Sequence, residues 1–273
     1  MKYIFENNTV SFEILDSFDI EQTFSCGQCF RWDKNSDGSF SAVVGSSYIT
    51  VCKENNILKI KNTSEYDFIH QWIRYFDLDR NYDEIRKFLC QKYEKLKKTA
   101  ACTAGIRILS QDPWEALCSF IISQNNNIPR IKGIIDRLCR QFGNHFEDFY
   151  TFPSADTLAI CKIEDLAPLR AGFRAKYIID AAQKVSRNQI NLEQLRTADL
   201  QTARSELMTI KGVGSKVADC TLLYGLHRLE AFPVDVWIKR AIETEFSDIK
   251  IEDLGDYAGI AQQYIFHYMR QLT

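Results

Sequence analysis

Residues 207–240 read LMTIKGVGSKVADCTLLYGLHRLEAFPVDVWIKR. An apolar helix end is followed by Gly212, Val213 and Gly214, and a second helix is expected to begin at about Ser215. Glycine permits a tight turn with positive φ and lets a bulky ligand approach the backbone. The free N–H groups at the positive dipole end of the second helix favour phosphate. This stretch therefore predicts two helices joined by a phosphate-binding hairpin.

Two charged residues of this stretch are candidates for chemistry. Lys216 lies in the first turn of the second helix, where a cation opposes the helix dipole, so helix stability does not explain it. Asp235 follows Pro233 and precedes another apolar run, which makes it an expected N-cap. Taken separately, the glycines are typical of a non-catalytic phosphate-binding turn and the aspartate of a plain N-cap. Together, Lys216 and Asp235 favour a catalytic site.

The segments GVGSKVADC and VDV resemble the helix–hairpin–helix and Gly/Pro/Asp motif of the base-excision DNA glycosylases, and the 8-oxoguanine DNA glycosylase/lyase family in particular. The resemblance covers nearly the whole chain. It implies an α+β fold, with an N-terminal antiparallel β-sheet domain with flanking helices and then an all-helical helix–hairpin–helix glycosylase domain. A change of pattern near residue 100 places these domains at residues 1–98 and 99–273.

The residue pattern on either side of this boundary supports the division. Alternating apolar residues bounded by turn signals predict three strands, and apolar residues at helical spacing predict a series of helices. The polar run from Ser123 to Asn127 has low helix propensity and predicts a loop. The expected strands are Phe40–Val44, Tyr48–Lys53 and Ile57–Lys61, and the expected helices are Asn81–Lys98, one from Pro113, Arg130–Phe142, Lys176–Val185 and Tyr257–Arg270.

The composition limits the class of protein to which the chain can belong, but it does not by itself indicate DNA binding. The 273 residues are 45% hydrophobic and 26% charged, with a net charge of −2, which argues against indiscriminate nucleic-acid binding but leaves room for a local basic face. No apolar run approaches the ~18–20 residues of a membrane span, and the first residues carry no signal-peptide pattern. We therefore expect a cytoplasmic protein without membrane contact, and a monomer.

The nine cysteines are odd in number and irregularly spaced, which favours reduced thiols in a cytosol over a disulfide framework. Cys26 and Cys29 form an isolated C-x-x-C pair, for which zinc or redox use stays an alternative. No cysteine follows Cys220, so the four-cysteine iron–sulfur loop of the endonuclease III branch is absent.

The resemblance implies a mechanism for Lys216 and Asp235. The lysine would attack C1′ of an extruded nucleotide as a free amine, a form that partial burial and a helix N-terminus both favour. The resulting Schiff base would make the adjacent sugar proton acidic and permit β-elimination of the strand. Asp235 would stabilise the oxocarbenium-like sugar and orient the lysine.

The resemblance also implies residues that recognise the base. The carbonyl of Gly27 would accept the N7–H that 8-oxoguanine has and guanine lacks; alone, a strand glycine is as often a bulge. Gln262 would read the base edge, Phe266 would stack on the base, and Cys220 would close its other face. For Phe266 and Cys220 the alternative is simple core filling.

A further set of residues would contact DNA. Asn125 would fill the gap left by the extruded base, Arg174 with Arg130 would read the widowed cytosine, and Phe173 would be the apolar wedge where several relatives carry Tyr. An exposed arginine such as Arg174 is otherwise a solvated charge. Trp237 stands where the family pattern leads us to expect His. The hairpin residues Gly212, Val213 and Gly214 would hold phosphate.

No cofactor is expected to be required. The carbonyls of Met208, Ile210 and Val213 could hold a structural monovalent cation, K⁺ or Na⁺, bridging to a DNA phosphate. The expected partner is double-stranded DNA containing 8-oxoguanine opposite cytosine. Two alternatives stay open: a glycosylase of the same superfamily with another base specificity, such as alkyl-purine or adenine, and a non-catalytic module that binds damaged DNA.

Overall fold

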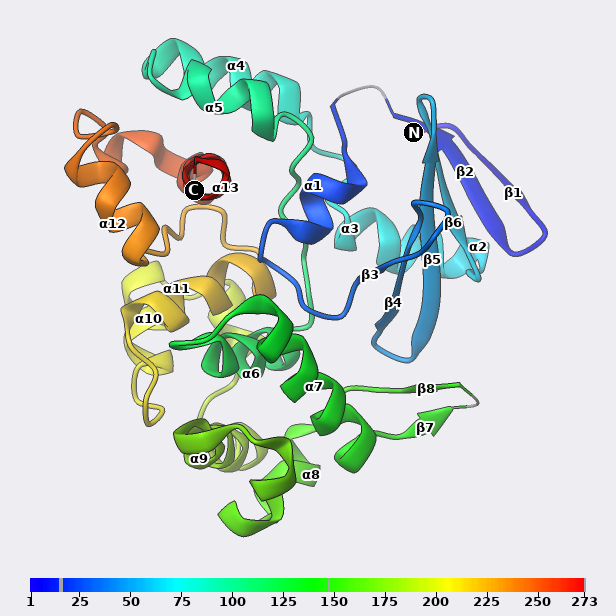
Figure 1. Cartoon of the computed structure of the whole chain (residues 1–273), viewed down its shortest axis with the longest axis vertical. Coiled ribbons are helices and arrows are strands. Elements are labelled where there is room, and N and C mark those ends of the chain that lie inside the picture. The colour runs from blue at the N-terminus through cyan, green and yellow to red at the C-terminus, as the bar shows by residue number, and fades with distance from the viewer. Residues whose placement is uncertain (15–16, 147, 273) are drawn as a thin grey trace.

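The computed structural model describes residues 1–14, 17–146 and 148–272. Figure 1 shows a β-sheet formed by the N-terminal part of the chain on one side and the helices of the C-terminal part on the other. The buried apolar residues form two clusters, a smaller one under the sheet and a larger one among the helices. The expected α+β fold is confirmed.

The sheet is antiparallel, with strand order β1-β2-β6-β5-β4-β3. The three expected strands are present, and β1 and β2 form an additional hairpin. That hairpin turns at Asn7 and Asn8, both with positive φ (49° and 54°), a conformation that asparagine tolerates well. The strands are β1 (Tyr3–Glu6), β2 (Thr9–Glu13), β3 (Asp33–Lys34), β4 (Phe40–Val44), β5 (Ser47–Glu54) and β6 (Ile57–Lys61).

Aromatic residues fill the space between the sheet and its helices. Helix α1 (Ile20–Ser25) places Phe24 in a stacked contact with Trp32, with ring centroids 3.9 Å apart. Phe68 and Trp72 of the π-helical turn η1 (Phe68–Trp72) and Tyr75 of α3 (Ile73–Tyr75) belong to the same cluster. Helix α2 (Glu65–Asp67) directly precedes η1. Phe24 of α1 belongs to the smaller cluster and Cys26, which follows α1, to the larger one, so the segment after α1 lies where the two clusters meet.

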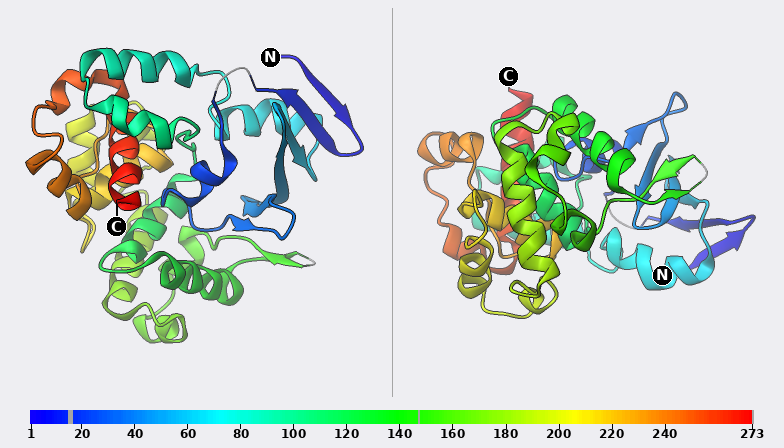
Figure 2. Two further views of the ribbon diagram at one scale, coloured as in Figure 1. Left: turned by 45° about the horizontal axis from the view of Figure 1, so that its top comes forward. Right: turned by 90° about the horizontal axis from the view of Figure 1, so that it is seen from below.

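The segment expected to be one helix from Asn81 to Lys98 is divided in two. Tyr93 has extended backbone (φ −131°, ψ 105°) and separates α4 (Tyr82–Lys92) from α5 (Leu96–Thr103). Tyr82, Ile85 and Leu89 of α4 belong to the larger core, and Figure 2 shows α5 beside the last helix, α13 (Ala258–Gln271). Packing in the larger core therefore begins before residue 98, while the domain boundary there stays a prediction.

Local capping signals in the helical part correspond to the observed helix starts. Asp112 caps α6 through the N–H of Glu115 (2.8 Å), and Asn127 caps α7 through the N–H of Arg130 (3.0 Å), so residues 124–127 form the expected loop. The elements are α6 (Pro113–Ser123), α7 (Ile128–Phe142), β7 (His145–Phe146), β8 (Phe149–Tyr150), α8 (Ala155–Ala159), η2 (Ile163–Leu169), η3 (Gly172–Arg174), α9 (Ala175–Ser186), η4 (Gln194–Arg196), α10 (Leu200–Leu207), α11 (Ser215–Cys220), η5 (Thr221–Gly225), α12 (Val236–Glu243), η6 (Ile251–Tyr257) and α13.

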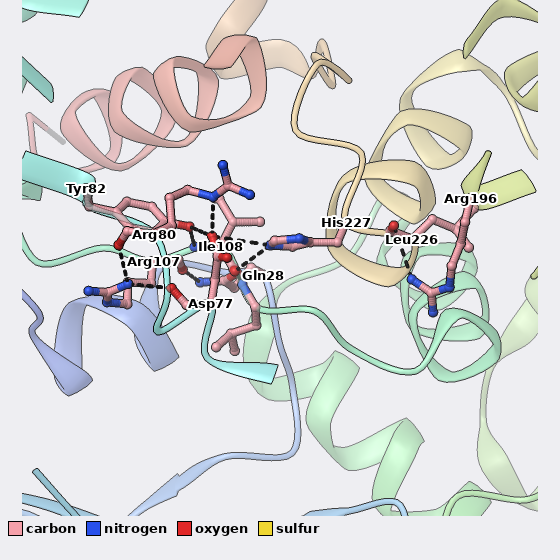
Figure 3. A network of polar contacts seen from close by, with 10 residues as sticks. Gln28, Asp77, Arg80, Tyr82, Arg107, Ile108, Arg196, Leu226 and His227 are labelled. Carbon is pink, nitrogen blue, oxygen red and sulfur yellow. Dashed lines mark hydrogen bonds and ion pairs between the residues drawn. The ribbon is translucent and has the colours of Figure 1, made fainter. Parts of the chain in front are cut away.

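A polar network joins the two parts of the molecule (Figure 3). Asp77 accepts from Arg80 Nε (2.7 Å) and from the Tyr82 hydroxyl (2.9 Å). His227, which follows η5, bonds the carbonyl of Ile108 (3.2 Å) and lies 3.7 Å from Asp77. Since these groups come from segments far apart in the chain, the network ties the segment after α3 to the start of α4, the segment before α6 and the end of η5.

The described residues contain no helix long and apolar enough to cross a membrane. All nine cysteines are free, including Cys26 and Cys29, and no cluster of metal-ligating side chains occurs among the described residues. The expectation of reduced thiols is thus consistent with the structure.

Candidate active site

The hairpin between α10 and α11 depends on one of its two glycines. Gly212 has φ +75°, and a Cβ built there would lie 2.3 Å from Cε2 of Tyr177. Gly214, the N-cap of α11, has extended backbone (φ −98°, ψ −178°) and open space at its Cβ position. The expectation that both glycines serve a turn of positive φ is therefore wrong for Gly214.

Lys216 lies in the first turn of α11 and is half-buried. Its Nζ is 3.5 Å from the Ser123 hydroxyl oxygen and 5.1 Å from the ring centroid of Phe120. Both contacts come from α6. The amine therefore lies over an aromatic face at the wall of a cavity rather than in open solvent.

Asp235 is the N-cap of α12, as expected. Its Oδ1 accepts from the N–H groups of Trp237 (3.0 Å) and Ile238 (2.9 Å). The side chain is half-buried and lies in the wall of the same cavity as Lys216. Because the capping bonds use Oδ1, they fix the orientation of the carboxylate in this wall.

This cavity, of about 850 Å³, lies where α6, α7, α11, α12 and α13 meet the segment after α1. It brings together five of the residues predicted for the site, Lys216, Asp235, Gly27, Phe266 and Asn125, and its volume falls in the range of small-molecule sites. Trp237, already noted as standing where His is expected, lines the cavity as well. The other lining residues were not predicted, and the only signal for most of them was that they lie close in sequence to a predicted site residue. They are Phe30, Phe120, Ser123, Gln124, Asn126, Asn127, Ile128, Pro129, Ile131, Val234, Val236, Lys239 and Arg270.

Gly27 and Phe266 face each other across one end of the cavity. Gly27 has φ +89°, and a Cβ there would lie 3.5 Å from both the Phe266 ring and the Arg270 guanidinium. The guanidinium carbon of Arg270 in turn lies 5.6 Å from the centroid of the Phe266 ring. The missing side chain at Gly27 therefore leaves the space next to the Phe266 ring open, and the positive φ favours glycine there.

Gln262 and Cys220 are close to the cavity but, among the described residues, are not part of its lining. Both are 3% exposed. Gln262 Nε2 donates to the carbonyl of Pro233 (3.0 Å), two residues before Asp235. Burial raises the pKa of the Cys220 thiol to about 11, although the neighbouring Lys216 lowers it. In this structure the two side chains lie behind the wall that Phe266 and Lys216 present.

Arg174 is buried, not an exposed charge. Its Nε donates to the carbonyl of Gln124 (2.8 Å) and a terminal nitrogen donates to that of Asn125 (2.9 Å). Burial lowers its pKa, and the nearby Arg130 lowers it further. Asn125 and Arg130 are exposed, and Asn125 has a positive φ of 51°. Arg174 therefore holds the loop that carries Asn125.

Phe173 is 49% exposed at the turn before α9. Its ring meets the ring of Tyr177 edge-on at 5.8 Å, and Tyr177 covers the space next to Gly212. The predicted wedge and the predicted phosphate-binding hairpin thus share one supporting side chain.

The hairpin carbonyls of Met208, Ile210 and Val213 were expected to hold a cation. Met208 is the C-cap of α10, where carbonyls lack intrahelical partners, and the Ile210 carbonyl accepts the N–H of Val213 (3.1 Å) with one of its two lone pairs. The donor set is therefore of the oxygen type that suits K⁺ or Na⁺.

Lys216 and Asp235 line one cavity, and the glycine hairpin directly precedes the helix that carries Lys216, an arrangement expected of a helix–hairpin–helix DNA glycosylase. The comparisons agree with it. Residues 12–117 match the family model described as the N-terminal domain of 8-oxoguanine DNA glycosylase, and residues 118–252 match the HhH-GPD superfamily of base excision DNA repair proteins.

Individual relatives extend the match over the whole chain. The N-glycosylase/DNA lyase of Saccharomyces cerevisiae is 33% identical over 83% of this chain and 68% of its own. The 8-oxoguanine glycosylase/lyase of Clostridium acetobutylicum, solved with double-stranded DNA carrying cytosine opposite 8-oxoG, is 35% identical with a TM-score of 0.92, covering 100% of this chain and 98% of that one. MBOgg1, solved with a low-affinity DNA ligand, is 43% identical with a TM-score of 0.94 and covers 100% and 99%.

The chain belongs to the 8-oxoguanine DNA glycosylase family of the HhH-GPD superfamily. It is accordingly a base-excision repair enzyme of the DNA N-glycosylase/lyase class, and that expectation is confirmed.

Proposed function

We propose that this enzyme excises 8-oxoguanine opposite cytosine in double-stranded DNA and then cleaves the strand through a Schiff base on Lys216. The observation that carries the proposal is that Lys216 and Asp235, from different helices, line one cavity with Gly27 and Phe266. The Clostridium relative bound to 8-oxoG:C duplex supports the choice of substrate.

The reaction begins with extrusion of the nucleotide from the duplex, at a cost of a few kcal/mol. The uncharged amine of Lys216, held by Ser123 and Phe120, attacks C1′, and the bond to the base breaks with its electron pair leaving on the base. Asp235, oriented by its capping bonds, stabilises the positive charge that develops on the sugar. The proton lost by the attacking nitrogen neutralises the departing base. The C1′–O4′ bond of the resulting aminal then opens, its electron pair and a proton from solvent go to O4′, and a Schiff base between Lys216 and C1′ is left. Loss of a proton from C2′ of this Schiff base expels the 3′ phosphate.

Recognition of the base uses the far end of the cavity. Phe266 provides a stacking surface worth ~1–3 kcal/mol per base, and the Gly27 carbonyl accepts the N7–H of 8-oxoguanine. Gln262 and Cys220 reach the base once their side chains move out from behind Phe266 and Lys216. Trp237 adds an aromatic face where a His was expected, so contact with phosphate is not proposed there.

DNA is held around this cavity by exposed residues. Asn125 fills the gap, Phe173 is the wedge, Arg130 reads the opposite base, and the Gly212–Gly214 hairpin receives phosphate. The carbonyls of Met208, Ile210 and Val213 would hold a monovalent cation, which would supply positive charge for a phosphate.

Borohydride trapping on 8-oxoguanine:cytosine duplex tests the proposal. The wild type should yield a covalent adduct and Lys216→Gln none, whereas Lys239→Gln, a lysine in the same cavity, is the matched control and should still be trapped. No adduct from the wild type, or an undiminished adduct from Lys216→Gln, would refute the lysine assignment. Repeating the assay with alkylated purine, adenine and undamaged guanine decides between base specificities.

A further inference from the structure

Two neighbouring glutamines of α13 bind two different segments of the cavity wall. Gln262 donates to the carbonyl of Pro233 (3.0 Å), and Gln263 Nε2 donates to the carbonyl of Cys26 (3.2 Å). Gln263 is 1% exposed, and Cys26 immediately precedes Gly27 in the chain. One turn of α13 therefore connects the wall near Asp235 with the wall at Gly27.

Tyr224 of η5 sets the orientation of the Gln263 amide. Its hydroxyl donates to Gln263 Oε1, which leaves Nε2 directed at the Cys26 carbonyl. Tyr224 is itself buried and stacks on Phe120, with ring centroids 5.3 Å apart and an interplanar angle of 24°. A buried polar chain with satisfied members keeps a single geometry, because any alternative leaves a polar group unpaired in low dielectric.

The other side of Gly27 is held as well. The Gln28 carbonyl accepts from Gln111 Nε2 (2.8 Å), and the Gln28 side chain donates to the carbonyls of Thr23 (2.9 Å) and Arg107 (2.7 Å). The carbonyls before and after Gly27 are thus each bound by a glutamine amide. Since the two flanking peptide planes are fixed, so is the direction of the Gly27 carbonyl between them.

We propose that Gln263, oriented by Tyr224, is a positioning residue for Gly27 and determines how well the enzyme distinguishes 8-oxoguanine from guanine. The inference rests on the proposed function, in which the Gly27 carbonyl reads N7–H. Without the Gln263 amide, the peptide between Cys26 and Gly27 can rotate. The Gly27 carbonyl then loses its alignment with the N7–H of the base. A misalignment of this kind costs on the order of 10- to 100-fold in rate.

The test compares two substrates, one with and one without a base. Gln263→Met removes both bonds of the amide and Tyr224→Phe removes only the hydroxyl, while Gln271→Met, an exposed glutamine on the same helix, is the control. We expect single-turnover release of 8-oxoguanine to fall 10- to 100-fold in Gln263→Met and less in Tyr224→Phe. Borohydride trapping at a preformed abasic site, where there is no base to read, should stay within about twofold of the wild type.

Two further measurements distinguish a positioning role of Gln263 from a general effect of its replacement on folding. Filter binding in a Lys216→Gln background should show a smaller ratio of affinities for 8-oxoguanine and guanine duplexes when Gln263→Met is added. In Gln263→Glu, a protonated carboxyl can donate to Cys26 where a carboxylate cannot, so its defect relative to wild type should shrink as pH falls.

Equal losses on the two substrates, or undiminished 8-oxoguanine release with an unchanged binding ratio, would overturn the inference. If the wild type itself forms no adduct at an abasic site, the proposed lysine chemistry fails, and the binding ratio alone then decides the role of Gln263.

Discussion

Arg174 donates from Nε to the carbonyl of Gln124 over 2.8 Å, so an arginine predicted to read a DNA base lies beneath the loop that carries Asn125. Its terminal nitrogens donate to the carbonyls of Gln124, Asn125 and Ala171 as well. To reach an opposite base, Arg174 would have to give up these bonds in a buried setting. The structure thus favours a role for Arg174 in shaping the loop.

Replacing Arg174 by Met should release this loop and slow base excision roughly tenfold with any of the four bases opposite the lesion, because the gap-filling Asn125 loses its support. Single-turnover rates on the four duplexes measure this. Arg130→Met should instead reduce only the preference for cytosine, and the exposed Arg187→Met is the control. A loss in Arg174→Met confined to the cytosine duplex would contradict the loop role.

Gly212→Ala should damage the hairpin, whereas Gly214→Ala should not. Alanine at Gly212 must adopt a left-handed backbone, at about 1–2 kcal/mol, and its Cβ collides with Tyr177. Thermal unfolding should report the destabilisation, and salt-dependent DNA binding should weaken because Tyr177 also supports Phe173. At Gly214 a Cβ meets open space. Equal behaviour of the two variants would argue against this account of the turn.

Asp180 holds the first residue of the hairpin turn. Its carboxylate accepts from the backbone N–H of Lys211 (2.8 Å) and pairs with Lys184 (3.0 Å). Burial alone would raise its pKa, but the Lys211 N–H and the ammonium groups of Lys184 and Lys211 lower it below its usual value. The stabilisation is therefore complete above the usual pKa of 3.8 and is lost as pH falls through the lowered pKa.

We expect Asp180→Asn to lower the free energy of unfolding at pH 7 by about 1–2 kcal/mol, as measured by urea denaturation. The difference in free energy of unfolding between Asp180→Asn and the wild type should disappear in strong acid. Asp136→Asn, which removes an exposed pair with Arg140, should change stability by less than about 0.5 kcal/mol. A deficit in Asp180→Asn that persists unchanged in acid would exclude the carboxylate as its source.

His227 should make stability depend on pH in mildly acidic solution. Burial lowers the pKa of His227, the carboxylate of Asp77 raises it, and the guanidinium of Arg80 lowers it. The resulting pKa lies below the usual 6.5. As the pH falls, the imidazole of His227 is therefore protonated in the unfolded chain at a higher pH than in the folded protein. The free energy of unfolding consequently decreases as the pH drops below about 6.5 toward the folded-state pKa. His227 also has a positive φ of 57°, which Asn tolerates.

The melting temperature of His227→Asn should consequently vary less than that of the wild type between pH 7 and pH 5. His70→Asn, at an exposed imidazole, should follow the wild-type curve. If His227→Asn also kept the full wild-type dependence, the network of Figure 3 would not be its origin.

The features that were predicted correctly from the sequence are those that neighbouring residues decide. Asp235 caps α12 through the N–H groups of Trp237 and Ile238, two and three residues away, so the signal and its result lie in the same few residues. The division at Tyr93 was missed because α4 and α5 each pack against the larger core, and tertiary packing overrides the helical pattern there.

The sequence by itself determined that this chain is a two-part α+β protein with a glycine hairpin, a lysine at a helix start and an aspartate that caps the next helix, since turn and cap preferences act within a few residues. Only the tertiary structure decided which residues share the cavity, that Arg174 turns inward, and that Gln263 reaches Cys26, 237 positions away in the chain. Such pairings depend on how distant segments pack, and an amide or a guanidinium is buried only where that packing supplies its partners.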